Sequence, residues 1–174
     1  TVIFDVGANI GLSTMYFNQR AKHLNIYAFE PVPQIFKILE HNCSLVDNGN
    51  QLHLINKGLG ARQETIAMNY LQSASAMSSI HGFDVEKKRA HDYIYKQKVG
   101  IFKGIARYFL EKQMDNAVKT NVEITTLSDV ISAHQITRID LLKIDVEGFE
   151  ENVLEGIQPE HFGLIEYIII EIET

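Results

Sequence analysis

The sequence predicts an α/β fold with a doubly wound, mainly parallel sheet and helices on both faces. Short apolar segments that end in polar residues alternate along the chain with helical segments, as in strands joined by crossover helices. The first apolar segment, Val2–Val6, runs into a turn with Gly7 and Gly11 and then into a helix. A strand, turn and helix of this kind is where α/β proteins bind nucleotide-like ligands.

Each strand is predicted from an apolar run and its polar end. The second run, residues 25–29, ends at Glu30-Pro31, and the third ends at Asn56-Lys57-Gly58. A later run, Leu141 to Ile144, contains Lys143 and ends at Asp145. In chain order we expect strand 2–6, helix 11–20, strand 25–30, helix 33–46, strand 52–57, short strand 64–69, strand 122–126, helix 127–134, strand 139–145, helix 149–156 and strand 165–172.

Five polar residues stand at or near predicted strand ends: Asp5, Glu30, Asn56, Asp145 and Glu171. Ligands of open parallel sheets bind beyond the carboxyl ends of the strands. We therefore expect these residues to form one site.

Composition indicates a single globular domain, 1–174, with a variable insert or lid at about 70–121. The chain has 174 residues, 45% hydrophobic and 22% charged, and a net charge of -6, which argues against a general nucleic-acid binder. Within the insert, residues 81–112 carry eight Lys or Arg against four Asp or Glu, together with six aromatic residues. This segment can be a lid over an anionic or glycosidic acceptor, a basic face against a membrane, or a solvated helical excursion.

One cysteine, Cys43, excludes an intrachain disulfide, and we expect it to be a buried helix thiol. No apolar run is long enough to span a bilayer, and no basic segment precedes an apolar one at the start. The sequence therefore predicts a cytoplasmic protein without a transmembrane segment.

The spacing of the first turn favours one kind of cofactor. Dinucleotide sites have G-x-G-x-x-G, but here Asn9 replaces the second glycine, which disfavours a diphosphate. The charge of Asp5 would repel phosphate and suits an amine or a sulfonium. Glu30 ends the second strand, where a carboxylate can accept both ribose hydroxyls. S-adenosylmethionine carries both cations and a ribose.

Three blocks carry a family resemblance: Asp5-Val-Gly-Ala-Asn-Ile-Gly11, Phe29-Glu30-Pro31 and Leu142-Lys-Ile-Asp-Val-Glu-Gly-Phe-Glu150. Together they resemble the FkbM family of S-adenosylmethionine-dependent methyltransferases, and the last block is the most specific. The resemblance covers both ends of the chain and thins out between about residues 70 and 121. It implies a Rossmann-like class I methyltransferase fold and, typically, O-methylation of a hydroxyl on a sugar or secondary metabolite.

The sheets of class I methyltransferases commonly have seven strands. We therefore expect that an upstream helix and the last two strands are either missing from this chain or replaced in the parent protein, and that the natural chain is longer.

The expected cofactor residues are Asp5, Gly7, Ala8, Asn9, Gly11, Glu30, Pro31 and Asn56. The turn would hold the methionine end, with Asp5 taking up its ammonium directly or through water, and S-adenosyl-L-homocysteine would be the product. Two assignments have structural alternatives. Asn9 can instead cap the first helix, and Asn56 can be a turn former beside Gly58. A serine-rich segment, 73–79, resembles a loop of the family that can close over the cofactor.

The expected catalytic residues are Asp145, Lys143, Glu147 and Glu171. Asp145 would take the proton of the acceptor, with Glu147 as the alternative base and Lys143 orienting the acceptor. A lysine in an apolar strand needs an acidic partner, for which Glu171 is the first choice and Asp145 the second. Alternatively, Asp145 caps the helix at 149–156, and Glu147 or Glu150 favours its dipole.

A divalent metal on Asp145, Glu147 and Glu171 is possible but not favoured, and the seven histidines have no paired ligand spacing. Other functions stay open: methylation of nitrogen or carbon, or a catalytically silent module that only binds the cofactor. A nicotinamide-dependent oxidoreductase is more distant, because the glycine spacing is wrong for it. The sequence leaves the acceptor and the oligomeric state open.

Overall fold

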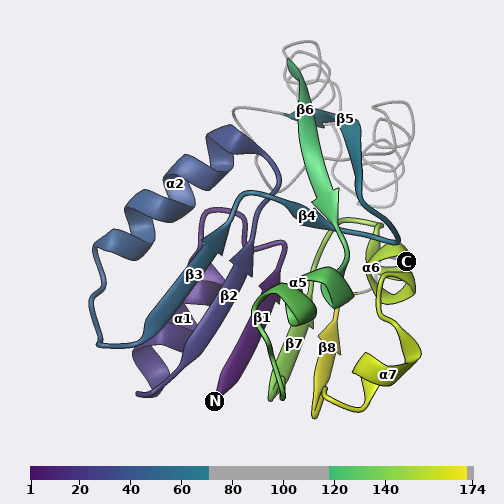
Figure 1. Ribbon diagram of the computed structural model, residues 1–174. Helices are drawn as coiled ribbons and strands as arrows, with labels where there is room; N and C mark the ends of the chain where they lie inside the picture. Colours follow the sequence, from purple (N-terminus) through teal and green to yellow (C-terminus); the bar gives the residue numbers. More distant parts are fainter. Residues whose placement is uncertain (71–117, 172–174) are drawn as a thin grey trace, which may run out of the picture. The chain divides into compact units, whose positions relative to one another are not determined.

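The structure is a computed structural model that describes residues 1–70 and 118–171 (Figure 1). Most of the predicted insert, with the serine-rich segment 73–79 and the basic segment 81–112, lies outside the described residues. The chain divides into two compact units, one of residues 1–66 and 121–174 and one of residues 67–120. The larger unit contains the residues predicted to bind the cofactor and those predicted to be catalytic.

The element order confirms the predicted alternation of strands and helices. The elements are β1 (Val2–Val6), α1 (Leu12–Arg20), β2 (Asn25–Phe29), α2 (Pro33–Ser44), β3 (Gln51–Ile55), β4 (Gly58–Leu59), β5 (Glu64–Tyr70), β6 (Val118–Thr125), α5 (Leu127–Ala133), β7 (Leu141–Ile144), α6 (Glu150–Glu155), α7 (Pro159–Phe162) and β8 (Ile168–Ile170).

A five-stranded sheet has the order β3-β2-β1-β7-β8, and every pair in it is parallel. This confirms the predicted parallel sheet. The pairing of β1 with β7 sets Asp5 opposite Lys143, which becomes important at the site. A second sheet of three strands has the order β4-β6-β5.

Helices cover both faces of the five-stranded sheet, as predicted. Phe4 and Val6 of β1 point to one face, where they share a buried cluster with Leu127 and Val130 of α5. Ala28 of β2 points to the other face and packs with Leu39 and Cys43 of α2. Figure 1 shows α5 in front of the sheet and α1 behind it. The alternation of side chains along each strand thus produces two cores, and Cys43 is a buried free thiol, as predicted.

Several element boundaries differ from those predicted. The last strand is Ile168–Ile170 rather than 165–172, because Ile165 makes only an isolated bridge to Ile139. Strand β6 begins at Val118, four residues before the predicted start, in a segment whose first residues are mainly exposed. The two-residue strand β4 and the one-turn helix α7 were not predicted, since segments of two and four residues carry no periodicity.

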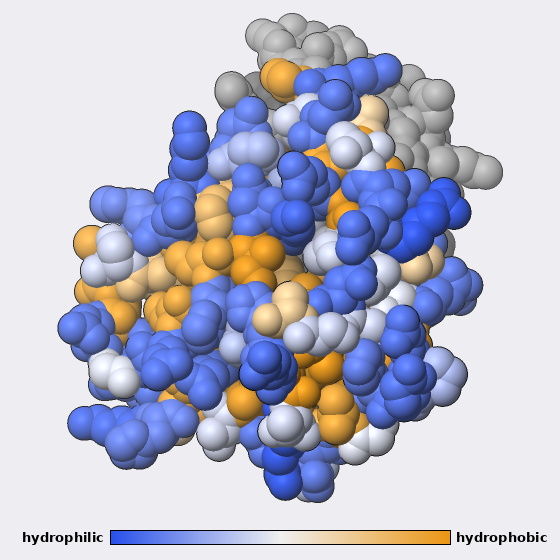
Figure 2. All heavy atoms as spheres, in the orientation of Figure 1, coloured by the Kyte–Doolittle hydropathy of each residue, from blue (hydrophilic) through white to orange (hydrophobic). Residues whose placement is uncertain are grey.

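No helix among the described residues has the length and apolar character that crossing a bilayer requires. Figure 2 shows a mainly hydrophilic surface on the face in view, with hydrophobic residues gathered over α2 and β3.

Gly156 follows α6 and packs closely against the backbone of Gly60. Substitution of this glycine therefore tests the fold. A Cβ atom on Gly156 would lie 2.1 Å from the carbonyl oxygen of Gly60. We expect Gly156→Ala to lower the free energy of unfolding by about 1 to 3 kcal/mol, because backbone must move to admit the methyl group. Gly163→Ala is the matched control, since a Cβ there meets nothing within 4 Å. Equal effects of the two substitutions in denaturant unfolding would contradict this packing.

Candidate active site

The five polar residues predicted at strand ends lie at the carboxyl edge of the sheet. Asp5 is in β1 one residue before its end, and Glu30, Asn56, Asp145 and Glu171 each follow the last residue of β2, β3, β7 and β8. The chain order reverses between β1 and β7, so Asp5 and Asp145 flank the topological switch point. Open α/β sheets bind their ligands at this point.

The turn after β1 has a backbone that favours glycine at three positions. Gly7 has φ +78°, Asn9 φ +51° and Gly11 φ +93°. Asparagine tolerates this left-handed region better than most residues, which explains its place between the two glycines. Gly7 has a second reason to be glycine, because a Cβ there would lie 1.8 Å from the carbonyl oxygen of Asp145. The absence of a side chain at Gly7 thus allows the end of β7 to pack against the turn.

Asn9 does not cap the first helix, so that alternative is wrong. Helix α1 begins at Leu12, its N-cap is Gly11, and no side chain caps it. The backbone N–H of Asn9 instead donates to Oε2 of Glu30, at 3.1 Å. The side-chain Oδ1 of Asn9 is buried and accepts no hydrogen bond within the part of the chain that the structure describes.

Glu30 joins the turns that follow β1 and β2. Its side chain is buried, and its two oxygens accept hydrogen bonds from the backbone N–H groups of Asn9 and Val32, at 3.1 and 2.9 Å. Burial raises the pKa of Glu30 to about 7, although both hydrogen bonds act in the opposite direction. A carboxyl group at this edge therefore changes its charge near neutral pH.

Asn56 holds the segment that carries Glu30. Its Nδ2 donates to the backbone carbonyl oxygens of Glu30 and Pro31, at 2.8 and 3.1 Å. The amide nitrogen therefore supports the turn after β2. Pro31 takes part through its carbonyl oxygen.

Asp5 lies beneath the turn and is fully buried. Its Oδ2 accepts hydrogen bonds from the hydroxyls of Ser13 and Thr14 in the first turn of α1, both at 2.6 Å. Its Oδ1 accepts no hydrogen bond from any described residue. Ser13 and Thr14 were not predicted as site residues, although two hydroxyl residues shortly after Gly11 are a signal in the sequence.

Lys143 pairs with Asp145 and Asp5, and the prediction of Glu171 as its partner is wrong. The Nζ atom lies 3.0 Å from Oδ2 of Asp145 and 3.4 Å from Oδ1 of Asp5. Glu171 directly follows the neighbouring strand β8, and its backbone N–H donates to the carbonyl of Ile144. The register explains the difference, because β8 sets Ile169 opposite Lys143, whereas β1 sets Asp5 there.

The structure does not support a capping role for Asp145. The N-cap of α6 is Phe149, and no side chain caps that helix. Glu150 does lie in the first turn of α6, and its carboxylate accepts a hydrogen bond from the N–H of Gly148 at 3.0 Å, so its favourable place at the helix dipole is consistent with the alternative reading. Glu147 follows β7 in the left-handed region, with φ +54°.

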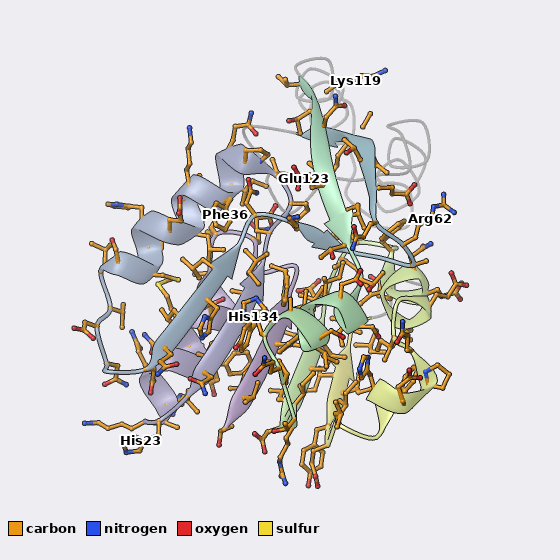
Figure 3. All side chains as sticks on the ribbon, in the orientation of Figure 1. His23, Phe36, Arg62, Lys119, Glu123 and His134 are labelled. Atoms are coloured by element: carbon orange, nitrogen blue, oxygen red, sulfur yellow. The ribbon has the colours of Figure 1, made fainter. Side chains whose placement is uncertain are left out.

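The described residues contain no group of three His, Cys, Asp or Glu side chains arranged to hold a metal ion. Two of the histidines pack with an aromatic ring instead: the ring of His53 stacks on Tyr27 at 4.3 Å, and His134 meets both rings edge-on. Figure 3 shows His134 beside the sheet. Burial, and to a lesser degree His134, lowers the pKa of His53.

Comparison with known families decides the identity of the fold. The family model described as the methyltransferase FkbM domain matches residues 5–174. The chain belongs to the FkbM methyltransferase family. Both the predicted resemblance and the Rossmann-like methyltransferase fold are thereby confirmed.

Two curated relatives of this chain carry methyltransferase names and cover nearly all of it. It is 30% identical over 177 residues to methyltransferase sdnD of Sordaria araneosa, covering 97% of this chain and 65% of that protein. It is 29% identical to the 31-O-demethyl-FK506 methyltransferase FkbM of Streptomyces tacrolimicus, covering 98% of this chain and 65% of that protein. The chain thus spans just under two thirds of the length of these relatives. No solved structure matched it.

Removal of the Lys143 ammonium should destabilise the protein strongly. Lys143→Met leaves the fully buried Asp5 without a cation, and we expect a loss of about 3 to 5 kcal/mol in the free energy of unfolding. Lys57→Met is the control, because the Lys57 and Glu123 pair is exposed and should contribute less than about 1 kcal/mol. If Lys143→Met and Lys57→Met lowered the free energy of unfolding equally in denaturant, the buried pair would contribute no more to stability than the exposed pair.

The stability of the protein should depend on pH through Glu30. The pKa of about 7 in the folded state lies above the ordinary value of 4.5, so the folded state binds the proton more tightly than the unfolded state. The stabilisation is fully present below about pH 4.5 and is lost as the pH rises through about 7. Between pH 4.5 and 8, the free energy of unfolding of wild type should fall by about 2 to 3 kcal/mol relative to that of Glu30→Gln.

Denaturant unfolding of both proteins across this pH range measures the difference, and Glu123→Gln controls for the removal of an exposed carboxylate. A gap between wild type and Glu30→Gln that stays constant with pH would contradict the burial of a charged carboxylate.

Proposed function

We propose that this protein transfers a methyl group from S-adenosylmethionine to an acceptor, most simply the hydroxyl of a sugar, glycan or secondary metabolite. The observation that carries the proposal is the arrangement of Glu30. A buried carboxyl group ends β2 and accepts the N–H of Asn9 from the turn after β1, so one residue joins the two turns that a nucleoside and its methionine tail would contact.

The residues present fit such a donor. The buried Oδ1 atom of Asn9 is an acceptor without a hydrogen bond among the described residues, which suits a ligand that brings N–H or O–H donors. In the proposal, the turn of Gly7, Ala8, Asn9 and Gly11 holds the methionine part. Asp5 contributes its negative charge from below, because its side chain is fully buried. Glu30 accepts the ribose hydroxyls, and Pro31 and Asn56 border the adenine.

S-adenosylmethionine supplies a methyl group on a positively charged sulfur and leaves as S-adenosylhomocysteine. The part of this chain is to align an acceptor oxygen and to remove its proton. Asp145 is the proposed base, since it follows β7 at the switch point and is partly exposed. Glu147 is the alternative base, Lys143 orients the carboxylate of Asp145, and Glu171 borders the acceptor side from β8.

Methylation of oxygen is favoured over that of nitrogen or carbon by the name of one relative, the 31-O-demethyl-FK506 methyltransferase. The acceptor itself is proposed only as a class, because the insert that would form a lid lies outside the described residues. A cytoplasmic location and the absence of nucleic-acid partners stay predictions.

Calorimetric titration with S-adenosylhomocysteine tests the cofactor site. We expect micromolar binding to wild type and at least about tenfold weaker binding to Glu30→Ala, since the lost carboxylate forms charge-assisted hydrogen bonds. Glu123→Ala is the matched control at an exposed site, and NAD is the control ligand. Tight binding of NAD, or no effect of Glu30→Ala in a folded protein, would contradict the assignment.

The chemical step has its own test. Asp145→Asn should bind S-adenosylhomocysteine within about threefold of wild type and lose about 100-fold or more in turnover with an acceptor found by screening. Turnover is followed as labelled methyl transfer. A protein that binds the cofactor product but methylates no acceptor would instead be the catalytically silent module.

A further inference from the structure

Lys143 lies between two carboxylates that differ greatly in their surroundings. Asp145 follows the strand and is about one-third exposed, whereas Asp5 is fully buried. The cluster therefore contains one more carboxylate than ammonium. At 3.0 Å the Nζ atom hydrogen bonds to Asp145, and at 3.4 Å it is only an ion-pair partner of Asp5.

Asp5 is incompletely satisfied in this arrangement. Its Oδ2 is held by the hydroxyls of Ser13 and Thr14, while its Oδ1 accepts no hydrogen bond from the described residues. A buried carboxylate oxygen without a hydrogen bond is costly, so a small shift of the Lys143 ammonium toward Oδ1 would be favourable. What opposes this shift is the competing hydrogen bond to Asp145.

We propose that Lys143 is a shared cation, which turns from Asp145 to Asp5 when the charge of Asp145 is neutralised, so that Asp5 is a positioning residue for the reaction. The inference rests on the proposed function, in which Asp145 is neutralised by the proton of the acceptor. Without Asp5, neutral Asp145 would remove the negative charge from both ion pairs that the structure gives the mainly buried Lys143.

The step balances within the proposed reaction. The acceptor oxygen forms a bond to the methyl carbon as the carbon–sulfur bond breaks, and that electron pair stays on sulfur. The hydroxyl proton passes to Asp145, which becomes neutral. Lys143 keeps its proton throughout and changes only the carboxylate to which it donates a hydrogen bond.

Other ionisable groups near the cluster do not replace Asp5. Cys43 of α2 faces Asp5, and burial, together with the charge of Asp5, raises the pKa of this thiol, which keeps it neutral. Glu171 follows β8, whose register sets Ile169 opposite Lys143, and Glu147 lies two residues beyond Asp145. Asp5 is the carboxylate set directly opposite Lys143 by the register of β1 and β7.

A mutant cycle tests the sharing without any reaction. Asp5→Asn and Asp145→Asn each leave Lys143 one carboxylate, and the double variant leaves neither. We expect the double variant to lose at least about tenfold more in the folded-to-unfolded ratio than the product of the single losses. In a Lys143→Met background the two substitutions should become multiplicative. Multiplicative losses with Lys143 present would overturn the proposal.

Asp145→Asn provides a second, structural readout in case Asp5→Asn does not fold. Asparagine mimics a neutral Asp145, so a crystal structure of this variant should show Nζ of Lys143 within about 3.0 Å of Oδ1 of Asp5. An unchanged distance of 3.4 Å would overturn the proposal.

Kinetics separate this inference from the proposed function. Because Asp5 also lies beneath the cofactor turn, turnover is measured at saturating S-adenosylmethionine, where Asp5→Asn should still lower kcat at least about tenfold with a working acceptor. Full turnover by Asp145→Asn would refute Asp145 as the base. The mutant cycle and the crystal structure would then be the two tests of the shared cation.

Discussion

The candidate site depends on one buried ion pair, between Asp5 of β1 and Lys143 of β7. Parallel pairing sets the two residues opposite each other, so the charge that would be costly at Asp5 is compensated across the strand. The same carboxylate ties the first turn of α1 to β1 through Ser13 and Thr14. One compensated charge therefore fixes the strand, the helix after it and the neighbouring strand in a single arrangement.

The second constraint is the burial of Glu30, which is unfavourable to stability and useful for binding. Two backbone N–H groups hold its carboxylate, but they offset the loss of water only in part, since its pKa stays near 7. If Glu30 served folding alone, the fold would be more stable with a glutamine in its place or with the carboxylate exposed to solvent. The cost is understandable if the carboxylate is kept for a ligand with hydroxyl donors, because such a ligand would provide the hydrogen bonds that water no longer can.

Sequence patterns predicted the sheet, the two helix layers and the line of polar residues at the strand ends, because these follow from periodicity and from apolar runs with polar ends. They did not predict the partner of Lys143. That partner depends on strand order and register, and in the sequence Asp5 is as distant from Lys143 as almost any residue. Likewise, Gly7 could be read as a turn glycine, but its contact with the backbone of Asp145 arises only when β7 packs beside β1. Long-range contacts of this kind are absent from local patterns.

The switch point explains why these residues can serve two substrates at once. The strands β1, β2 and β3 bring the turn, Glu30 and Asn56 to one side, while β7 and β8 bring Asp145 and Glu171 to the other. In the proposed reaction the donor and the acceptor would approach from these two sides and meet at the switch point between β1 and β7. The charge that joins the sides is then the ammonium of Lys143, since it contacts a carboxylate from each. Protonation of Asp145 on the acceptor side would thereby move the Lys143 ammonium toward Asp5, which lies beneath the donor turn.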